Sequence, residues 1–165
     1  MHPLIEHLAR VTAIGVGATA TMDLWLLLLQ RQGMATLSFA MIGRWVGHWR
    51  RGVFRHAAIS KAAPVKGELA LGWLAHYATG VAFAALLVGA SGAAWTRSPT
   101  LLPALCVGVA TVAAPWLVMQ PAMGAGIASS RTPAPAMNRI RSLANHAIFG
   151  LGLYLSALLV AWLSR

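Results

Sequence analysis

Residues 8–30, LARVTAIGVGATATMDLWLLLLQ, decide the fold class of this chain. The stretch is long enough to cross a bilayer as a helix, because a hydrocarbon core of about 30 Å requires about 20 mainly apolar residues. It also contains Asp23, one of three acidic side chains in the chain. Because an ionisable group is costly inside a membrane span, Asp23 is a candidate functional residue as well as part of the fold.

Three more stretches of similar length and hydropathy follow, at about 68–90, 101–123 and 143–163. Hydrophobic residues make up 58% of the 165 positions, which exceeds the roughly 45–50% of soluble domains. The pattern predicts an all-α membrane protein with four transmembrane helices in a bundle. Loops at about 31–67 and 124–142 occupy most of the remainder, so we expect a single integral membrane domain over residues 1–165.

In a soluble protein, a net charge of +10 would indicate nucleic-acid binding. In this chain, the positions of the basic residues are better explained by membrane topology. Most of the basic residues fall in the two loops at 31–67 and 124–142, which the positive-inside tendency places in the cytoplasm. Both termini are then periplasmic, and no nucleic-acid partner is expected. The abundance of arginine over lysine and of alanine is typical of GC-rich bacterial genomes, so we assign the chain to a bacterial inner membrane.

The first loop contains a segment with apolar and basic residues on opposing stripes at helical spacing. It predicts a basic amphipathic interfacial segment between the first and second spans, although Gly43, Gly47 and Gly52 each weaken a helix by about 1 kcal/mol. We expect it to cover the cytoplasmic end of the bundle; recognition of a specific lipid or partner is the alternative. The side chains expected to contact anionic lipid headgroups are Arg44, Arg50, Arg51 and Arg55.

Polar side chains from all four spans are expected at a similar depth in the cytoplasmic half. Asp23 lies eight residues before Arg31, and His76 lies eight residues after Glu68, so each is about 12 Å from the cytoplasmic surface. We therefore predict a polar pocket, open toward the cytoplasm, in which Asp23 and His76 share a proton. The predicted ligand-binding or proton-coupling residues are Asp23, His76, Gln120, Asn145 and His146.

Small residues predict which helix faces are internal, because membrane helices approach each other at such positions. Gly72, Gly80 and Ala84 share a stripe with His76, and Thr12, Gly15 and Thr19 share one with Asp23. In the fourth span, Asn145 and His146 lie about 100° apart, so both reach the interior only if that helix is wedged between two neighbours. Pro115 is expected to bend or loosen the third span.

Three classes of function fit this pattern. The first is binding or transport of a small ligand or ion, with proton coupling through Asp23 and His76. The second is a metal- or haem-dependent membrane enzyme that uses His76 and His146, with Asp23 as a further ligand or as a hydrogen-bond acceptor for a metal-bound ligand. Separately, Met119 and Met123 form an i, i+4 pair that could hold a soft metal. The third is an accessory subunit of a larger membrane complex. For the transporter, a homo-oligomer is expected, because four short helices leave little room for a full translocation path. The residues specify no cofactor, and the single Cys106 excludes dithiol chemistry.

Four segments of the chain resemble a family of small bacterial membrane proteins known as domain of unknown function 2938. The resemblance spans nearly the whole chain and implies a four-helix inner-membrane protein. It brings no established activity, cofactor or substrate, so it draws attention to these segments without assigning a role to any residue. The segments are GATATMDLW (17–25), GELALGWLAHYATGVAF (67–83), PWLVMQPAMGAGIASSRTP (115–133) and SLANHAIFGLGLY (142–154).

Overall fold

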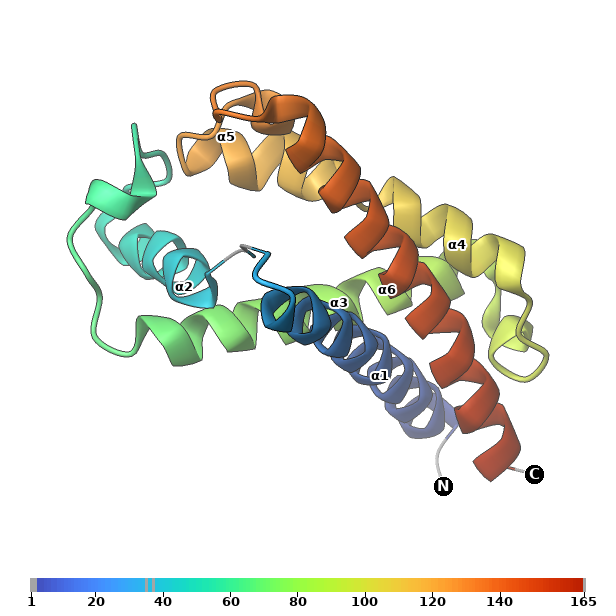
Figure 1. The fold of residues 1–165 in the computed structure, drawn as a ribbon. Helices are drawn as coiled ribbons and strands as arrows, with labels where there is room; N and C mark the ends of the chain where they lie inside the picture. Colours follow the sequence, from blue (N-terminus) through green and yellow to red (C-terminus); the bar gives the residue numbers. More distant parts are fainter. Residues whose placement is uncertain (1–2, 35, 37, 165) are drawn as a thin grey trace. The chain divides into compact units, whose positions relative to one another are not determined.

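The computed structural model describes residues 3–34, 36 and 38–164, and within these ranges all regular structure is helical. Figure 1 shows the course of the helices along the chain. Short 3₁₀ turns and one π-helical segment lie between the α-helices. The α-helices are α1 (Pro3–Arg31), α2 (Phe39–His48), α3 (Glu68–Ser91), α4 (Leu101–Ala110), α5 (Gln120–Ala122) and α6 (Pro135–Leu163).

Four helical segments in the described part of the chain are long and apolar enough to cross a membrane: Leu4–Arg31, Glu68–Ser91, Leu101–Ala122 and Pro135–Leu163. They coincide with the four predicted spans, but two helices begin earlier than expected. α1 starts at Pro3 instead of about residue 8, and α6 starts at Pro135 instead of about residue 143. Hydropathy locates only the continuous apolar run, and polar or charged residues such as Glu6 in α1 and Asn138 in α6 interrupt it near the start of each helix. Both helices begin with a proline, whose fixed φ suits the first helical position.

The third candidate span is interrupted around Pro115. α4 ends at Ala110, and a π-helix over Pro115–Met119 precedes α5. The N–H of Gln120 donates to the carbonyl of Pro115, five residues back, which is the hydrogen bond of a π-helix. A proline lacks an N–H and its ring crowds the preceding turn, so the expected loosening of the helix takes the form of this wider turn.

The residues divide into two compact units. Unit 1 comprises Met1–Met34, Tyr77–Thr111 and Ala144–Arg165, and unit 2 comprises Ala35–His76 and Val112–Leu143. Each unit is described by itself below.

In unit 1, α1 and α3 pack closely through small residues. A Cβ atom on Gly15 would lie 2.5 Å from the Cα of Val81, and one on Gly80 would overlap the hydroxyl of Thr19. Thr19 is buried, as the predicted internal stripe requires, whereas Thr12 at the outer end of that stripe is exposed. Because later positions on α1 meet earlier positions on α3, the two helices run antiparallel.

Helix α6 contacts two helices of unit 1 through two different faces. A Cβ atom on its Gly152 would lie 2.9 Å from the Cα of Ala18 in α1, and one on its Gly150 would lie 2.9 Å from the carbonyl oxygen of Ala104 in α4. The condition set by the sequence, that α6 be wedged between two neighbours, is therefore met. Both faces of α6 that carry polar residues reach the interior of unit 1.

In unit 2, α2 packs against the first turns of α3. A Cβ on Gly43 would overlap the carbonyl oxygen of Glu68 and lie 2.6 Å from the N of Gly72. Gly43, Gly47 and His48 are buried. The glycines that weaken an isolated helix therefore form the face on which α2 meets the rest of unit 2, and the side chain of His48 is buried beside them.

Candidate functional site

The carboxylate of Asp23 in α1 accepts a hydrogen bond from the hydroxyl of Tyr77 in α3, at 2.8 Å. Both side chains are half-buried. This contact fixes the direction of the carboxylate inside unit 1 and makes Tyr77 part of the candidate site.

The predicted residue Asn145 in α6 also has a partner on another helix. Its amide oxygen accepts a hydrogen bond from the indole Nε1–H of Trp25 in α1, at 3.0 Å. The acceptor side of the Asn145 amide therefore faces α1, two residues beyond Asp23.

The imidazole of His146 in α6 faces α4. Its Nδ1 lies 3.0 Å from the hydroxyl of Thr111 and 3.3 Å from the carbonyl of Gly108, while that hydroxyl itself donates to the same carbonyl at 2.6 Å. Since the hydroxyl proton is already used and a carbonyl only accepts, the neutral imidazole carries its proton on Nδ1. The Nε2 lone pair is then the basic position of His146.

These three contacts lie at one level of unit 1. Asp23 meets Tyr77, Trp25 meets Asn145, and Thr111 meets His146, each across an antiparallel helix pair. α1, α3, α4 and α6 thus each contribute a polar group near the same height. The layer in unit 1 contains Asp23, Trp25, Tyr77, Thr111, Asn145 and His146.

The predicted residue His76 belongs to unit 2, and its described neighbours there are aromatic. Its ring centroid lies 4.7 Å from that of Phe39 and 6.1 Å from that of Trp73. Asp23 belongs to unit 1, so the shared proton between Asp23 and His76 stays a prediction.

Gln120 lies in unit 2, where its side-chain oxygen accepts a hydrogen bond from the hydroxyl of Ser129 at 3.2 Å. Ser129 is buried and belongs to the connection between α5 and α6. In the described structure Gln120 therefore holds this connection against the end of the third span.

The metal- or haem-dependent alternative stays a prediction, because His76 belongs to unit 2 and His146 to unit 1. No group of three or more His, Cys, Asp or Glu side chains that could hold a metal ion occurs among residues 3–34, 36 and 38–164. Met123 is buried and Met119 half-buried in unit 2, where both are accounted for as apolar packing.

A second polar cluster, in unit 2, is centred on Arg44. Its guanidinium forms two hydrogen bonds with the carboxylate of Glu68, at 2.8 and 2.9 Å, and a third with the carbonyl of Ala62 at 3.1 Å. The backbone N–H of Val65 donates to the same carboxylate at 2.9 Å. Arg44 was predicted to contact lipid headgroups. In the structure, its guanidinium instead donates its hydrogen bonds to Glu68 and to the carbonyl of Ala62.

His48 and His56 form a hydrogen-bonded pair in unit 2. Nδ1 of His48 lies 2.7 Å from Nε2 of His56, and the backbone N–H of His56 donates to the carbonyl of Ala122 at 2.8 Å. Burial, followed by repulsion from a charged His48, lowers the pKa of His56. One ring must supply the shared hydrogen and the other must accept it, so the two rings cannot both be protonated while this contact is kept.

The His48–His56 pair predicts that acid destabilises the fold. Because the pKa of His56 is lowered in the folded state, the unfolded chain binds more protons, and stability is full above about pH 6.5 and falls as the pH drops toward the lowered value. Thermal unfolding in mild detergent between about pH 5 and 8 will measure this loss. His56→Gln is expected to flatten the dependence and His7→Gln, on α1 in unit 1, to leave it; an unchanged profile in His56→Gln contradicts the assignment.

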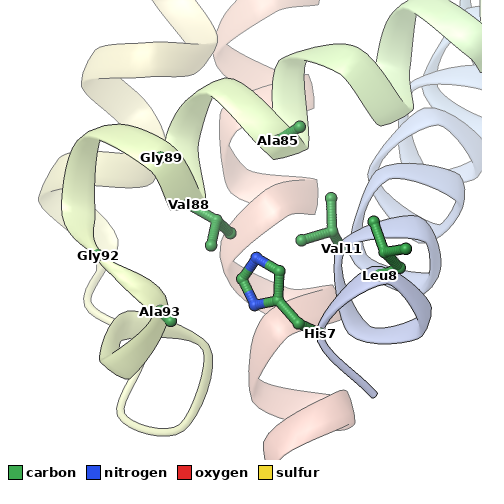
Figure 2. A pocket seen from close by; sticks show the side chains of 8 residues that line it. All are labelled: His7, Leu8, Val11, Ala85, Val88, Gly89, Gly92 and Ala93. Carbon is green, nitrogen blue, oxygen red and sulfur yellow. The ribbon is translucent and has the colours of Figure 1, made fainter. Parts of the chain in front are cut away.

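A cavity of about 320 Å³ lies in unit 1 between α1 and α3, near the beginning of α1 (Figure 2). The imidazole of His7 points into it among otherwise apolar side chains (Figure 2). None of the predicted site residues lines this cavity. Its lining residues are His7, Leu8, Val11, Ala85, Val88, Gly89, Gly92 and Ala93.

Three residues of the polar layer in unit 1 were not among the predicted ligand-binding residues: Trp25, Tyr77 and Thr111. A usable signal was present, since the N–H of a tryptophan and the O–H of a tyrosine usually find a partner when buried. Trp25 and Tyr77 stand within two residues of Asp23 and His76 in the sequence. Their aromatic rings favour an interpretation as packing or interface anchors, and only the helix contacts reveal the hydrogen bonds.

Comparisons with curated proteins and with solved structures find no match. Residues 12–160 match the model of the family described as "Protein of unknown function (DUF2938)". This range covers nearly the whole chain and contains every residue of the polar layer in unit 1. The chain therefore belongs to the DUF2938 family.

Proposed function

We propose that this chain is a multi-pass protein of the bacterial inner membrane whose polar layer binds a small ligand or cation, with a proton exchanging at Asp23. The observation that carries the proposal is the Asp23 carboxylate, placed within a candidate span and hydrogen-bonded to Tyr77 at 2.8 Å. Both termini are periplasmic in this proposal, in keeping with the basic loops at 31–67 and 124–142.

The chemistry of a carboxylate in a span supports exchange of a proton or cation. An ionised carboxylate in a membrane interior is costly, and it is stable there as the neutral acid or beside a positive charge. The phenol of Tyr77 donates a hydrogen bond but carries no positive charge. A carboxylate within a span is therefore suited to exchange a proton or a cation.

The neighbouring groups supply further contacts for a small polar ligand. The amide of Asn145 has two N–H donors besides the oxygen that meets Trp25, and Nε2 of His146 is an acceptor at the same level. A carboxylate, an amide and an imidazole provide oxygen and nitrogen ligands without any thiolate. Such a set favours a small cation or a polar amine over a soft metal.

Carbodiimide labelling tests this proposal, because dicyclohexylcarbodiimide reacts with protonated carboxyl groups in apolar surroundings. In protein reconstituted in lipid nanodiscs, we expect an adduct on Asp23 that decreases as the pH rises and decreases further with added NaCl. Tyr77→Phe removes a donor to the carboxylate and should increase labelling at a given pH. Mass spectrometry of peptides locates the adduct.

The matched controls use the other two acidic side chains of the sequence, Glu6 and Glu68. Asp23→Asn should abolish the adduct, whereas Glu6→Gln should retain it, since Glu6 lies on an exposed part of α1 in an ion pair with Arg10. Adducts confined to Glu6 or Glu68, or labelling of Asp23 that does not depend on pH, would rule out proton exchange at this site.

A further inference from the structure

The turn that follows α2, residues 49–55 with the sequence WRRGVFR, is held in one conformation by its own hydrogen bonds. The N–H of Gly52 donates to the carbonyl of Trp49 at 2.9 Å, and that of Val53 donates to the carbonyl of His48 at 3.3 Å. Gly52 has φ 70°, a left-handed conformation that glycine adopts at little cost. The indole N–H of Trp45 fixes the far side by donating to the carbonyl of Phe54 at 2.9 Å.

This folded turn exposes large apolar side chains. Trp49 and Val53 are each 42% exposed, and Phe54 is 58% exposed. The ring of Trp49 packs edge-on against Trp45 at 4.9 Å between centroids and lies 6.3 Å from that of Phe54. The exposed apolar surface is therefore a contiguous aromatic cluster on a rigid turn, not a set of scattered side chains.

Positive charge surrounds this cluster. Arg50, Arg51 and Arg55 are all exposed, and the sole acidic residue in the sequence of unit 2, Glu68, is engaged with Arg44. The turn consequently presents three guanidinium groups beside exposed apolar rings. A binding partner complementary to this turn has an anionic surface with an apolar layer beneath it.

We propose that residues 49–55 form an interfacial anchor that docks on the anionic lipid surface of the bilayer. Trp49, Val53 and Phe54 enter the headgroup boundary, and the arginines contact lipid phosphates. Glu68 begins the second candidate span and is tied to Arg44 of α2, so α2 lies beside the end of a span, at the level of the membrane surface. The proposal rests on the membrane insertion proposed above.

The structure assigns this contact differently from the sequence pattern. The amphipathic pattern predicted that the length of α2 lies on the membrane, with Arg44 among the headgroup contacts. The glycine face of α2 is instead packed against α3, and Arg44 is paired with Glu68. Of the predicted headgroup contacts, Arg44 is thus engaged with Glu68, and the proposal retains Arg50, Arg51 and Arg55 of the turn. The competing hypothesis is that the turn binds a soluble acidic protein. In that case Val53 would be exposed to water in a lipid nanodisc that contains no such protein.

Site-directed spin labelling distinguishes these partners and separates the anchor from membrane insertion. The chain has one native cysteine, Cys106, which is exposed on α4, so a nitroxide there reports whether this candidate span faces lipid. A nitroxide at Val53→Cys in a Cys106→Ala background reports the turn. Relative accessibility to oxygen and to a water-soluble nickel chelate gives the depth of each probe in nanodiscs of phosphatidylglycerol or phosphatidylcholine.

We expect the probe at position 53 to sit at interfacial depth in phosphatidylglycerol and to shift toward water when Arg50→Gln and Arg51→Gln are combined. The charge-matched control combines Lys61→Gln with Lys66→Gln, two exposed lysines of the same connection, and should leave the depth unchanged. The shift should be smaller in phosphatidylcholine, because a neutral surface attracts arginine weakly.

Each contrary result has a distinct meaning. A water-exposed probe at position 53 together with a lipid-exposed probe at Cys106 overturns the anchor and leaves membrane insertion intact. Water exposure of both probes overturns the membrane proposal itself. Equal depth in both lipids, with no effect of the arginine substitutions, overturns the role assigned to the charges.

Discussion

Replacing Gly72 with alanine will destabilise the protein by about 1–3 kcal/mol or more, the range seen when an atom is forced into a packed contact. A Cβ at Gly72 would overlap the carbonyl oxygen of Phe39 and lie 3.1 Å from the backbone N of Gly43. The obstacle is backbone on the facing helix, which cannot turn aside as a side chain can. The substitution must therefore separate α2 from α3, and unfolding in mixed micelles followed by circular dichroism will measure the loss.

Gly89 offers a matched control within the same helix. It also lies in α3, but a Cβ there would meet no atom within 4 Å. Gly89→Ala is expected to be neutral or to stabilise the helix by up to about 1 kcal/mol, because alanine loses less conformational freedom than glycine. Equal destabilisation by Gly72→Ala and Gly89→Ala would show that the close approach of α2 to α3 is not what Gly72 provides.

Replacing Glu68 with glutamine will lower the thermal unfolding midpoint by much more than a typical surface substitution. The change removes the charge that faces Arg44 while its guanidinium remains 14% exposed and oriented by the carbonyl of Ala62. A partly buried cation without its counter-charge is unfavourable. Because one carboxylate connects α2, the N–H of Val65 and α3, its loss should loosen all three.

Glu6→Gln is the appropriate comparison, because Glu6 and Arg10 form an i, i+4 ion pair at 2.9 Å with Glu6 half exposed to solvent. Exposed pairs contribute little to stability, so its midpoint should stay close to that of the wild type. Combining Glu68→Leu with Arg44→Met should recover part of the loss, since replacing both charges leaves neither unpaired. A midpoint for Glu68→Gln equal to that for Glu6→Gln would contradict the structural role of the Arg44–Glu68 pair.

The height of a side chain along a membrane span can be predicted from the sequence, as Asp23 shows. Counting residues from the ends of the spans placed Asp23 and position 76 at similar heights, and Asp23 meets a side chain at that height. The contact that the structure describes is with Tyr77, the next residue. Successive residues on a helix differ by only about 1.5 Å in height but point about 100° apart, so counting residues locates the height of a side chain much better than the direction in which it points.

The packing role of the glycines was the feature least predictable from the sequence. By helix propensity alone, Gly43 and Gly47 weaken a helix. The residues next to them in the sequence do not identify the helix that they pack against. Gly72 on α3 supplies that partner for Gly43. A glycine that permits two backbones to meet is recognisable only once both helices are placed, because the same residue also serves flexible or turning segments.

By itself the sequence determined that the chain is helical, that four segments are long and apolar enough to cross a bilayer, and that it belongs to the DUF2938 family. These properties depend on residues that are consecutive in the sequence, so they can be predicted without knowing which residues are neighbours in space. Tertiary structure alone decided that Tyr77 donates to Asp23, that Arg44 pairs with Glu68, and that the turn after α2 carries the exposed aromatic cluster. Hydrogen bonds and close approaches depend on the rotation and register of one element against another, and these are set by packing between residues far apart in the chain.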